Sequence, residues 1–388
     1  MIALLDRAVV SSTPRGRRVS HRRRHAGPAP RSRDGVGQTC HVRPSTLRSA
    51  LPASLVVLSL ALAGCGGGDD GEKKSGGKSD TPTSASPTPA PPATWPLTGE
   101  LTDGGADPAR KHPAYIVKID NSSASDPQIG VGKADLVVEE LVEGGITRLA
   151  VFYYSKLPEK AGPVRSMRLT DIGIAKPLGA SIVTSGAAPV TLNGLRKAGI
   201  KFLDMNNPNV VRINDGTHDS LHSVMANLKK IGAGARGDAK RPDDYLPFGD
   251  TPLPAGAPAT TIDVQLSGGR TSHWKLEGQK YVLQNGYMPE GDVFKPDTVI
   301  AATVRTTLAP YTDPAGNPVP VSHFEGKGKA VIFHAGQAID VTWEKADEGA
   351  ELSFKDAAGN EIEIPAGRTW LELVPGKGAA ATGSVSYR

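Results

Sequence analysis

Cysteine is nearly absent from this chain of 388 residues, which contains two, Cys40 and Cys65. Both precede every stretch that has the periodicity of a strand or a helix. The folded part of the chain therefore has no disulfide, no CxxC metal or redox pair and no thiol nucleophile. Its stability has to come from packing.

Aromatic residues and long apolar runs are also scarce. Aromatics make up 5% of the chain, so the aromatic walls that a glycosidase cleft needs around a carboxylate pair such as Glu139 and Glu143 are not evident. The apolar stretch at 51–63, LPASLVVLSLALA, is too short for a stable membrane-spanning helix. It has the length of the hydrophobic region of a signal peptide.

The net charge of +5 is concentrated at one end of the chain. Residues 1–64 contain eleven Arg and two Asp, a contribution of +9, which leaves −4 for residues 65–388. This mildly acidic remainder argues against a nucleic-acid partner. The basic stretch before residue 42 exceeds what a signal peptide needs, so we expect either a disordered basic leader from Met1 or a true translation start near Val42.

A short motif, Leu62-Ala63-Gly64-Cys65, directly follows the apolar stretch. It resembles the lipobox of bacterial lipoproteins, in which the Cys carries lipid and the peptide before it is removed. The resemblance implies lipidation of Cys65 and anchoring on the extracytoplasmic face of the cell membrane. We therefore expect residues 1–64 to be a signal peptide with a basic leader.

Composition divides the rest of the chain into parts, and the predicted fold class is α+β. Residues 65–109, rich in Gly, Ser, Thr and Pro, predict a disordered lipidated tether. Strands that alternate with helices predict a mixed α/β domain over 110–234, and a Pro/Gly/Asp-rich segment predicts a linker over 235–259. Closely spaced short strands predict a small all-β domain over 260–378, followed by a tail at 379–388.

Within the α/β domain, three helices are expected at about 166–176, 190–198 and 220–231, each ended by a proline or a glycine. Two neighbouring strands, at 135–142 and 146–154, predict a β-hairpin. Its expected turn is the Gly-Gly pair at 144–145, because both residues tolerate positive φ.

The pairing across this turn determines which charged side chains share a face of the hairpin. If Glu143 pairs with the residue just after the two glycines, then Glu139, Glu143 and Arg148 share one face of the hairpin, whereas Glu140 points the other way. Carboxylates near a guanidinium on an apolar face either form an ordinary cross-strand salt bridge or anchor a charged loop or ligand.

Two arginines, Arg165 and Arg168, stand at the start of the helix expected after the hairpin. They can grip a phosphate or carboxylate with help from free backbone N–H groups, or they can neutralise Glu139 and Glu143 internally. Other polar residues follow predicted strands, where α/β sheets place ligand sites. The candidate ligand- or partner-binding set is Asp120, Asn121, Glu139, Glu143, Arg148, Arg165, Arg168 and His218.

Catalytic and metal motifs are incomplete. His218 and His222 have the H-x-x-x-H spacing of zinc enzymes, but no Glu follows the first His and a third ligand has no obvious place. Ser185 follows a predicted strand, as a nucleophile does, without the G-x-S-x-G context. We therefore assign no catalytic residue, no metal and no cofactor.

Several motifs together resemble the YerB-type lipoproteins of Gram-positive bacteria, a two-part domain of unknown function. The motifs are VKIDN at 117–121, ADLVVEE at 134–140, VEGGITR at 142–148, GPVRSMR at 162–168 and IPAGRTW at 364–370. The resemblance covers about residues 110–378 and implies a surface-anchored protein with an α/β part and a β part, but no reaction. One departure is His218-Asp219, where the family is expected to have His-Asn.

From these observations we expect a lipid-anchored protein of the cell envelope that binds without catalysis. Its partner would be the membrane, through the lipid on Cys65, together with another wall-assembly protein or an anionic cell-wall ligand. The alternatives are a cell-wall hydrolase and a solute-binding lipoprotein.

Overall fold

A computed structural model describes residues 93–376, 378 and 381–388 of the chain. The expected signal peptide and basic leader, the lipidation site Cys65 and the tether as far as residue 92 lie outside the described residues. In the described part, no helix is both long and apolar enough to cross a membrane.

The folded body begins before the boundary expected at residue 110. The Trp95 N–H donates to the Glu100 carbonyl at 2.9 Å, and the backbones of Thr94 and Leu101 form a β-bridge. Leu97 is buried in an apolar cluster. The expectation of a disordered tether as far as residue 109 is therefore corrected. The side chains of Trp95 and Leu97 pack on the apolar cluster and hold the stretch from residue 93 on the folded body.

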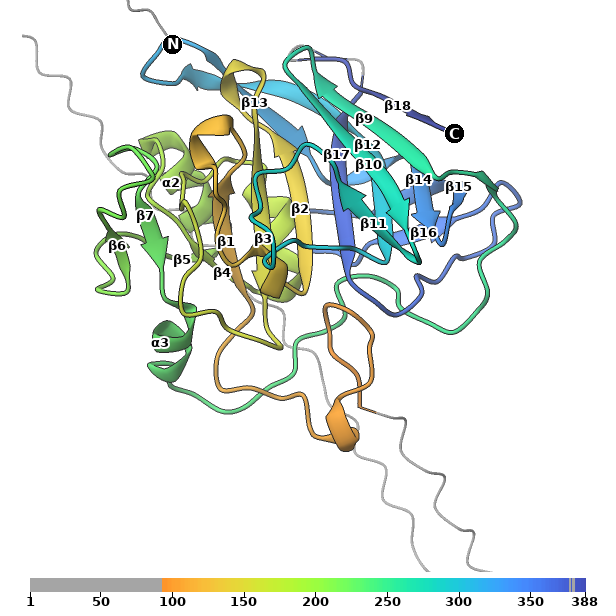
Figure 1. Cartoon of the computed structure of the whole chain (residues 1–388), viewed down its shortest axis with the longest axis horizontal. Coiled ribbons are helices and arrows are strands. Elements are labelled where there is room, and N and C mark those ends of the chain that lie inside the picture. The colour runs from red at the N-terminus through yellow and green to blue at the C-terminus, as the bar shows by residue number, and fades with distance from the viewer. Residues whose placement is uncertain (1–92, 377, 379–380) are drawn as a thin grey trace, which may run out of the picture. The chain divides into compact units, whose positions relative to one another are not determined.

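A large sheet runs through most of the described chain (Figure 1). Its strands are β1 (Tyr115–Asp120), β2 (Leu136–Leu141), β3 (Thr147–Tyr153), β4 (Ser181–Val183), β5 (Lys201–Leu203), β8 (Ala257–Pro258), β12 (Thr298–Thr312), β13 (Pro318–His323), β14 (Gly326–His334), β15 (Gln337–Lys345), β16 (Ser353–Lys355) and β17 (Thr369–Pro375). The order is β16-β15-β14-β12-β17-β2-β3-β1-β4-β5, with β13 paired to β12 and β8 to β15.

Strand β17 joins the two regions that composition separated. It lies between β12 and β2 and is parallel to both. The segment at 235–259, expected to be a linker between domains, therefore connects two parts of one continuous sheet.

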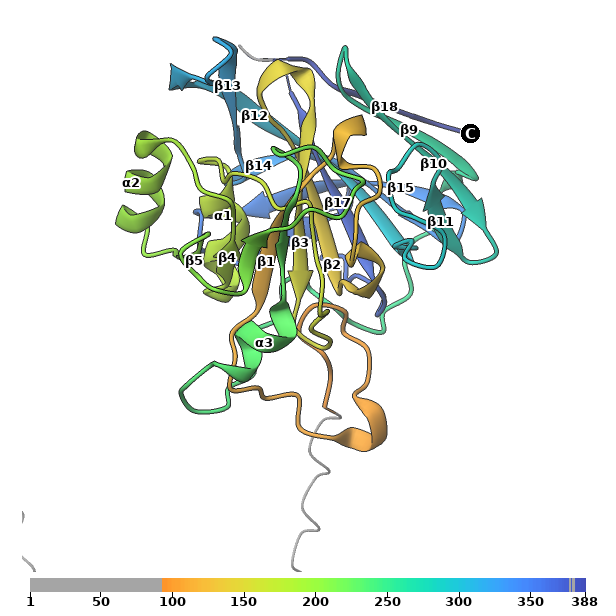
Figure 2. The ribbon, with the colours of Figure 1, turned by 60° about the vertical axis from the view of Figure 1, so that its left-hand side comes forward.

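Smaller elements cover the two faces of this sheet (Figure 2). One side carries the helices α1 (Asp171–Ala175) and α2 (Pro189–Lys197). The other side carries a second sheet in the order β11-β10-β9-β18. Its strands are β9 (Thr261–Ser267), β10 (Arg270–Glu277), β11 (Lys280–Leu283) and β18 (Ser384–Tyr387). The ribbon of β6 (Val210–Arg212) and β7 (Val224–Ala226) is followed by α3 (Leu228–Ala233).

The large sheet is apolar on both faces, and neighbouring residues of β2 show the alternation. Val138 belongs to the buried cluster that includes Leu195 of α2, whereas Val137 belongs to the cluster that includes Trp274 of β10. Burial on both faces explains why β1, β2 and β3 read as nearly continuous apolar runs.

The expected helix at 190–198 is confirmed as α2, and the one at 166–176 is reduced to α1 and a turn of 3₁₀-helix. The expected helix at 220–231 is wrong in its first half, where β7 pairs with β6 and α3 begins only at Leu228. The Asp219 carboxylate accepts from the N–H groups of the two residues at 221 and 222, so it closes a local turn there rather than capping a helix.

Candidate functional site

The β2–β3 hairpin closes with a three-residue loop, Glu143–Gly145, instead of the expected two-residue turn. Gly144 and Gly145 both have positive φ, 70° and 75°, as the Gly-Gly pair predicts. The extra loop residue shifts the pairing by one position, so Glu140 lies opposite Arg148.

This shift moves Glu139 to the other face of the sheet, because side chains alternate along a strand. The prediction that Glu139, Glu143 and Arg148 share one face is therefore wrong for Glu139. Arg148 instead shares its face with Glu140 and, across β1, with Asp120. The candidate residues thus fall into two groups on opposite sides of the sheet.

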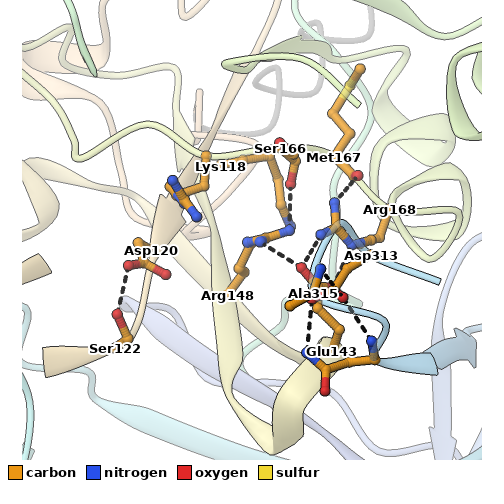
Figure 3. Close-up of polar contacts among 12 residues, drawn as sticks. Lys118, Asp120, Ser122, Glu143, Arg148, Ser166, Met167, Arg168, Asp313 and Ala315 are labelled. Carbon is orange, nitrogen blue, oxygen red and sulfur yellow. Dashed lines mark hydrogen bonds and ion pairs between the residues drawn. The ribbon is translucent and has the colours of Figure 1, made fainter. Parts of the chain in front are cut away.

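On the first side, Glu143 bridges two arginines (Figure 3). Its Oε1 accepts from Arg148 Nη2 at 3.0 Å and its Oε2 from Arg168 Nε at 2.8 Å, and Arg168 Nη2 also contacts Oε1. Burial opposes ionisation of Glu143, but the hydrogen bond from Arg168 and the charges of both arginines outweigh it and lower the pKa of this carboxyl to about 2. This ion pair ties the hairpin to the loop before α1.

Arg165 takes no part in that ion pair. Its Nη1 donates to the Leu221 carbonyl at 2.8 Å, and its backbone N–H donates to the Lys118 carbonyl at 2.7 Å. Among residues 93–376, 378 and 381–388, no carboxylate lies within ion-pair distance of its guanidinium, and its enclosed Nε has no hydrogen-bond partner. Internal neutralisation, one of the two expected arrangements, therefore holds for Arg168 and not for Arg165.

The three guanidinium groups are close enough to influence one another. Burial and the nearby charges of Arg168 and Arg165 lower the pKa of Arg148, against the attraction of Glu143. Two of the three share the carboxylate of Glu143. Arg165, which is half-buried, is the member of the group that reaches solvent.

Asp120 ends β1 beside this group and is buried. Its Oδ2 accepts from Ser122 Oγ at 2.7 Å and lies 3.2 Å from His222 Nε2. Its neighbour Asn121 points to the opposite face of the sheet, where its Nδ2 donates to Glu139. Adjacent residues at the end of one strand thus serve the two separate groups.

Sequence reasoning missed a buried ion-pair triad on the first side. Lys118 Nζ lies 2.5 Å from Glu140 Oε1 and 2.8 Å from Asp171 Oδ1, and all three side chains are fully buried. Burial alone would lower the pKa of Lys118, but the charges of Asp171 and Glu140 raise it, so the ammonium stays charged. The signal was present in the sequence, since a charged residue inside the apolar run YIVKID has to find a partner.

On the second side, Glu139 is fully buried beneath β10. Its Oε1 accepts from Asn121 Nδ2 at 2.9 Å, Thr147 Oγ1 at 2.7 Å and Arg270 Nε at 2.9 Å. Glu372 of β17 lies opposite it in the sheet and accepts from Trp274 Nε1 at 3.0 Å. Glu139 is therefore an internal anchor and does not belong to an open binding site with Arg165.

The two histidines do not converge on one point. His218 Nδ1 lies 2.9 Å from Asp215 Oδ2 and its Nε2 lies 3.1 Å from the Pro127 carbonyl, whereas His222 lies between Asp219 and Asp120. In the part of the chain that the structure describes, no group of three His, Cys, Asp or Glu side chains has the geometry of a metal site.

Ser185 lies beside Arg165 and follows β4. Its backbone N–H donates to the Arg165 carbonyl at 3.2 Å. The neighbouring Thr184 Oγ1 donates to the same carbonyl at 3.1 Å and to the Gly186 carbonyl at 2.8 Å. These bonds fix the backbone that carries the guanidinium.

The edge of the sheet where ligands of α/β proteins usually bind carries the group on the first side, which comprises Asp120, Glu143, Arg148, Arg165 and Arg168. β1, β2, β4, β5, β12 and β17 all run in one direction, so their carboxyl ends share this edge. A hollow of about 230 Å³ lies beside the hairpin tip and is lined by Leu141, Val142, Gly144, Leu308 and Pro318, among others. The same edge of the sheet thus carries the guanidinium of Arg165, which no carboxylate pairs within the described residues, and a separate hollow beside the hairpin tip.

Comparisons with known proteins agree with this architecture. Residues 97–241 match the family model of the N-terminal domain, and residues 262–371 that of the C-terminal domain, of the proteins of unknown function DUF3048. A curated relative, "Putative lipoprotein YerB" of Bacillus subtilis (strain 168), is 27% identical over 312 residues, which are 74% of this chain and 87% of the relative. The crystal structure of the B. subtilis YerB protein superposes with a TM-score of 0.62 at 20% identity, over 76% of this chain and 99% of that one.

Proposed function

The chain belongs to the DUF3048 family, and we propose that it is a lipid-anchored protein of the cell envelope that binds an anionic group of a partner through Arg165. The lipid would be carried by Cys65, on the extracytoplasmic face of the membrane. The partner would be a wall-assembly protein or an anionic cell-wall ligand, bound without catalysis.

One observation carries this proposal: Arg165 is the guanidinium of its group that no carboxylate neutralises within the described residues. Glu143 is already shared by Arg148 and Arg168. A planar guanidinium with open donor positions is suited to bidentate binding of a carboxylate or phosphate.

The surroundings support this role. The backbone of Arg165 is hydrogen bonded to β1 and to the turn after β4, so the guanidinium is mounted on two strands of the large sheet.

The experiment compares three forms of the lipoprotein in intact cells by crosslinking and mass spectrometry: the natural chain, Arg165→Ala and Arg236→Ala. Arg236 is a matched control, because its Nη1 also donates to a backbone carbonyl, at 3.0 Å, and it is exposed. We expect Arg165→Ala to lose crosslinks that Arg236→Ala keeps.

A parallel arm measures the binding of pyrophosphate to the purified chain by calorimetry. Loss of one charge-assisted contact corresponds to an affinity roughly tenfold lower in Arg165→Ala, with no change in Arg236→Ala. If Arg165→Ala folds normally but changes neither the crosslinks nor the pyrophosphate affinity, the proposed site is wrong.

A further inference from the structure

The loop at 214–222, between β6 and β7, lies against Arg165. Its base is closed by the Ile213 N–H, which donates to the Ser223 carbonyl at 2.8 Å. β7 is held to the body beyond that point, since the Val164 N–H donates to the Val224 carbonyl at 2.7 Å. The ribbon is therefore fixed, and the loop is the part that can move.

Few contacts hold this loop on the body. Most of its residues are exposed, Leu221 with 63% of its surface. Within the described residues, the polar contacts of its side chains and carbonyls with the rest of the protein are the Arg165 hydrogen bond to the Leu221 carbonyl, a Lys160–Asp215 ion pair at 3.7 Å, and the contacts of His218 and His222.

His222 faces a carboxylate on each side. Its Nδ1 lies 2.9 Å from Asp219 Oδ2, and its Nε2 lies 3.2 Å from Asp120 Oδ2. Ionised carboxylates are negatively charged and only accept hydrogen bonds, so the hydrogen bond with Asp219 and the ion-pair contact with Asp120 are both favourable only when both ring nitrogens carry a proton. The geometry is that of an imidazolium ion that joins the loop to the end of β1.

His218 repeats the arrangement with different partners. Its Nδ1 lies 2.9 Å from Asp215 Oδ2, and its Nε2 lies 3.1 Å from the Pro127 carbonyl. A backbone carbonyl is also an acceptor only, so this ring too needs both protons to make both bonds. His222 thus connects the loop to the end of β1, and His218 connects it to the Pro127 carbonyl further along the chain. Each ring keeps both of its contacts only when both of its nitrogens are protonated.

We propose that the loop at 214–222 is a lid over Arg165, which the protonated His218 and His222 hold shut and which opens as the pH rises and the rings lose their second proton. Histidine is the side chain whose charge ordinarily changes between about pH 5 and 8. Opening frees Arg165 Nη1 from the Leu221 carbonyl, so the lid regulates the anion site; this consequence rests on the proposed function of Arg165.

The charged groups around the two rings are consistent with a closed, ionised lid. Hydrogen bonds from His218 lower the pKa of Asp215, and the hydrogen bond from His222 lowers the pKa of Asp219. Lys160 faces Asp215, and Arg148 lies near Asp120. Both loop carboxylates therefore stay ionised well below neutral pH.

The sign of the binding effect separates this lid from simple charge attraction. Protonated histidines near Arg165 would, by charge alone, make anion binding stronger at low pH. A lid that closes at low pH makes it weaker there. Because pyrophosphate itself gains negative charge over this range, the comparison is with the double variant His218→Gln, His222→Gln. We expect the affinity for pyrophosphate to increase several-fold more in the natural chain than in that variant between about pH 5.5 and pH 8.

The first test uses hydrogen–deuterium exchange of the full-length chain, at about pH 5.5 and pH 8, corrected for the intrinsic pH dependence of amide exchange. We expect protection of peptides covering 214–222 to fall about tenfold at the higher pH. In the double variant His218→Gln, His222→Gln, the loop should be unprotected at both pH values. His273→Gln is the matched control, because His273 Nδ1 also faces a carboxylate, Asp263 Oδ1 at 2.6 Å, but on the second sheet.

Loop protection that does not change with pH in the natural chain, or that changes equally in the double variant, would overturn the lid. The calorimetric arm distinguishes the two proposals. If protection depends on pH as expected but Arg165→Ala binds pyrophosphate like the natural chain, the lid stands and the anion site fails. If the anion site holds and protection is constant, the lid alone is wrong.

Discussion

Glu139 and Glu372 lie directly opposite each other on the parallel strands β2 and β17, and both side chains are fully buried. One arginine, Arg270, serves the pair through Glu139. Burial and the neighbouring charge of Glu139 raise the pKa of Glu372 well above its ordinary range. Two carboxyl groups therefore share one cation at the junction of the two family domains. The stability of that junction should depend on whether Glu372 is ionised.

Glu372→Gln tests whether the Glu372 carboxyl is protonated in the folded protein. A carboxyl whose pKa is raised by folding contributes stability that is complete below its unfolded pKa, near 4.3, and is lost as the pH rises toward its folded value. The neutral amide avoids that loss and its carbonyl can still accept from Trp274. We expect a stability close to that of the natural chain at about pH 4 and a higher stability at about pH 8, measured by chemical denaturation. Equal stability differences at both pH values would show that Glu372 is ionised in the folded state.

Lys118→Met removes the cation from between Glu140 and Asp171. Two buried carboxylates would then lack a counter-charge, which typically costs about 3–5 kcal/mol of unfolding free energy. Lys229→Met is the control, because its ion pair with Glu159 is exposed to solvent and contributes little to stability. Denaturation curves for both variants at neutral pH provide the measurement, and similar losses would contradict the assignment of the triad.

Glu143→Gln tests whether Arg148 and Arg168 can bind an anion once the carboxylate that they share is removed. The substitution removes the negative charge shared by Arg148 and Arg168, so we expect pyrophosphate binding to strengthen by about tenfold. A group whose pKa is lowered to about 2 contributes stability above its unfolded pKa that is lost as the pH falls toward 2. The variant should therefore be less stable at neutral pH and should lose less stability on acidification. Unchanged anion affinity would show that the two arginines stay inaccessible.

Gly130→Ala and Gly144→Ala separate two energetic costs of adding a methyl group: an unfavourable backbone conformation at positive φ, and a steric clash with a neighbouring atom. Both glycines have positive φ, but a Cβ at Gly144 would meet no atom within 4 Å, whereas one at Gly130 would lie 2.5 Å from the Lys160 carbonyl oxygen. We expect a loss of about 1 kcal/mol for Gly144→Ala, from conformation alone, and a clearly larger loss for Gly130→Ala. Thermal or chemical denaturation distinguishes them, and equal losses would mean that the loop at Gly130 can relax.

Much of the local structure is predictable because it depends on neighbouring residues. The strands expected at 135–142 and 146–154 contain β2 and β3, and the Gly-Gly pair marks the hairpin loop. The pairing register was not predictable, since a loop of three residues and a turn of two fit the same sequence. That single residue decides whether Glu139 or Glu140 shares a face with Arg148.

The candidate site was predictable only in part for the same reason. The link between Glu143 and Arg168 follows from charges in adjacent segments. Contacts between distant segments, such as Glu139 with Arg270 or Gly130 with Asp292, leave no periodic signal in the chain. The two adjacent glutamates at 139 and 140 did contain a usable hint, because consecutive residues of a buried strand must place one carboxylate on each face.

The position of β17 also constrains the order in which this protein can fold. The strand comes from residues 369–375, yet it fills the gap between β2 and β12, which are made much earlier. Until it arrives, two strands with open hydrogen-bonding edges and apolar faces are exposed, a state prone to mispairing. A chain truncated before residue 369 should therefore aggregate rather than yield a separately folded N-terminal half.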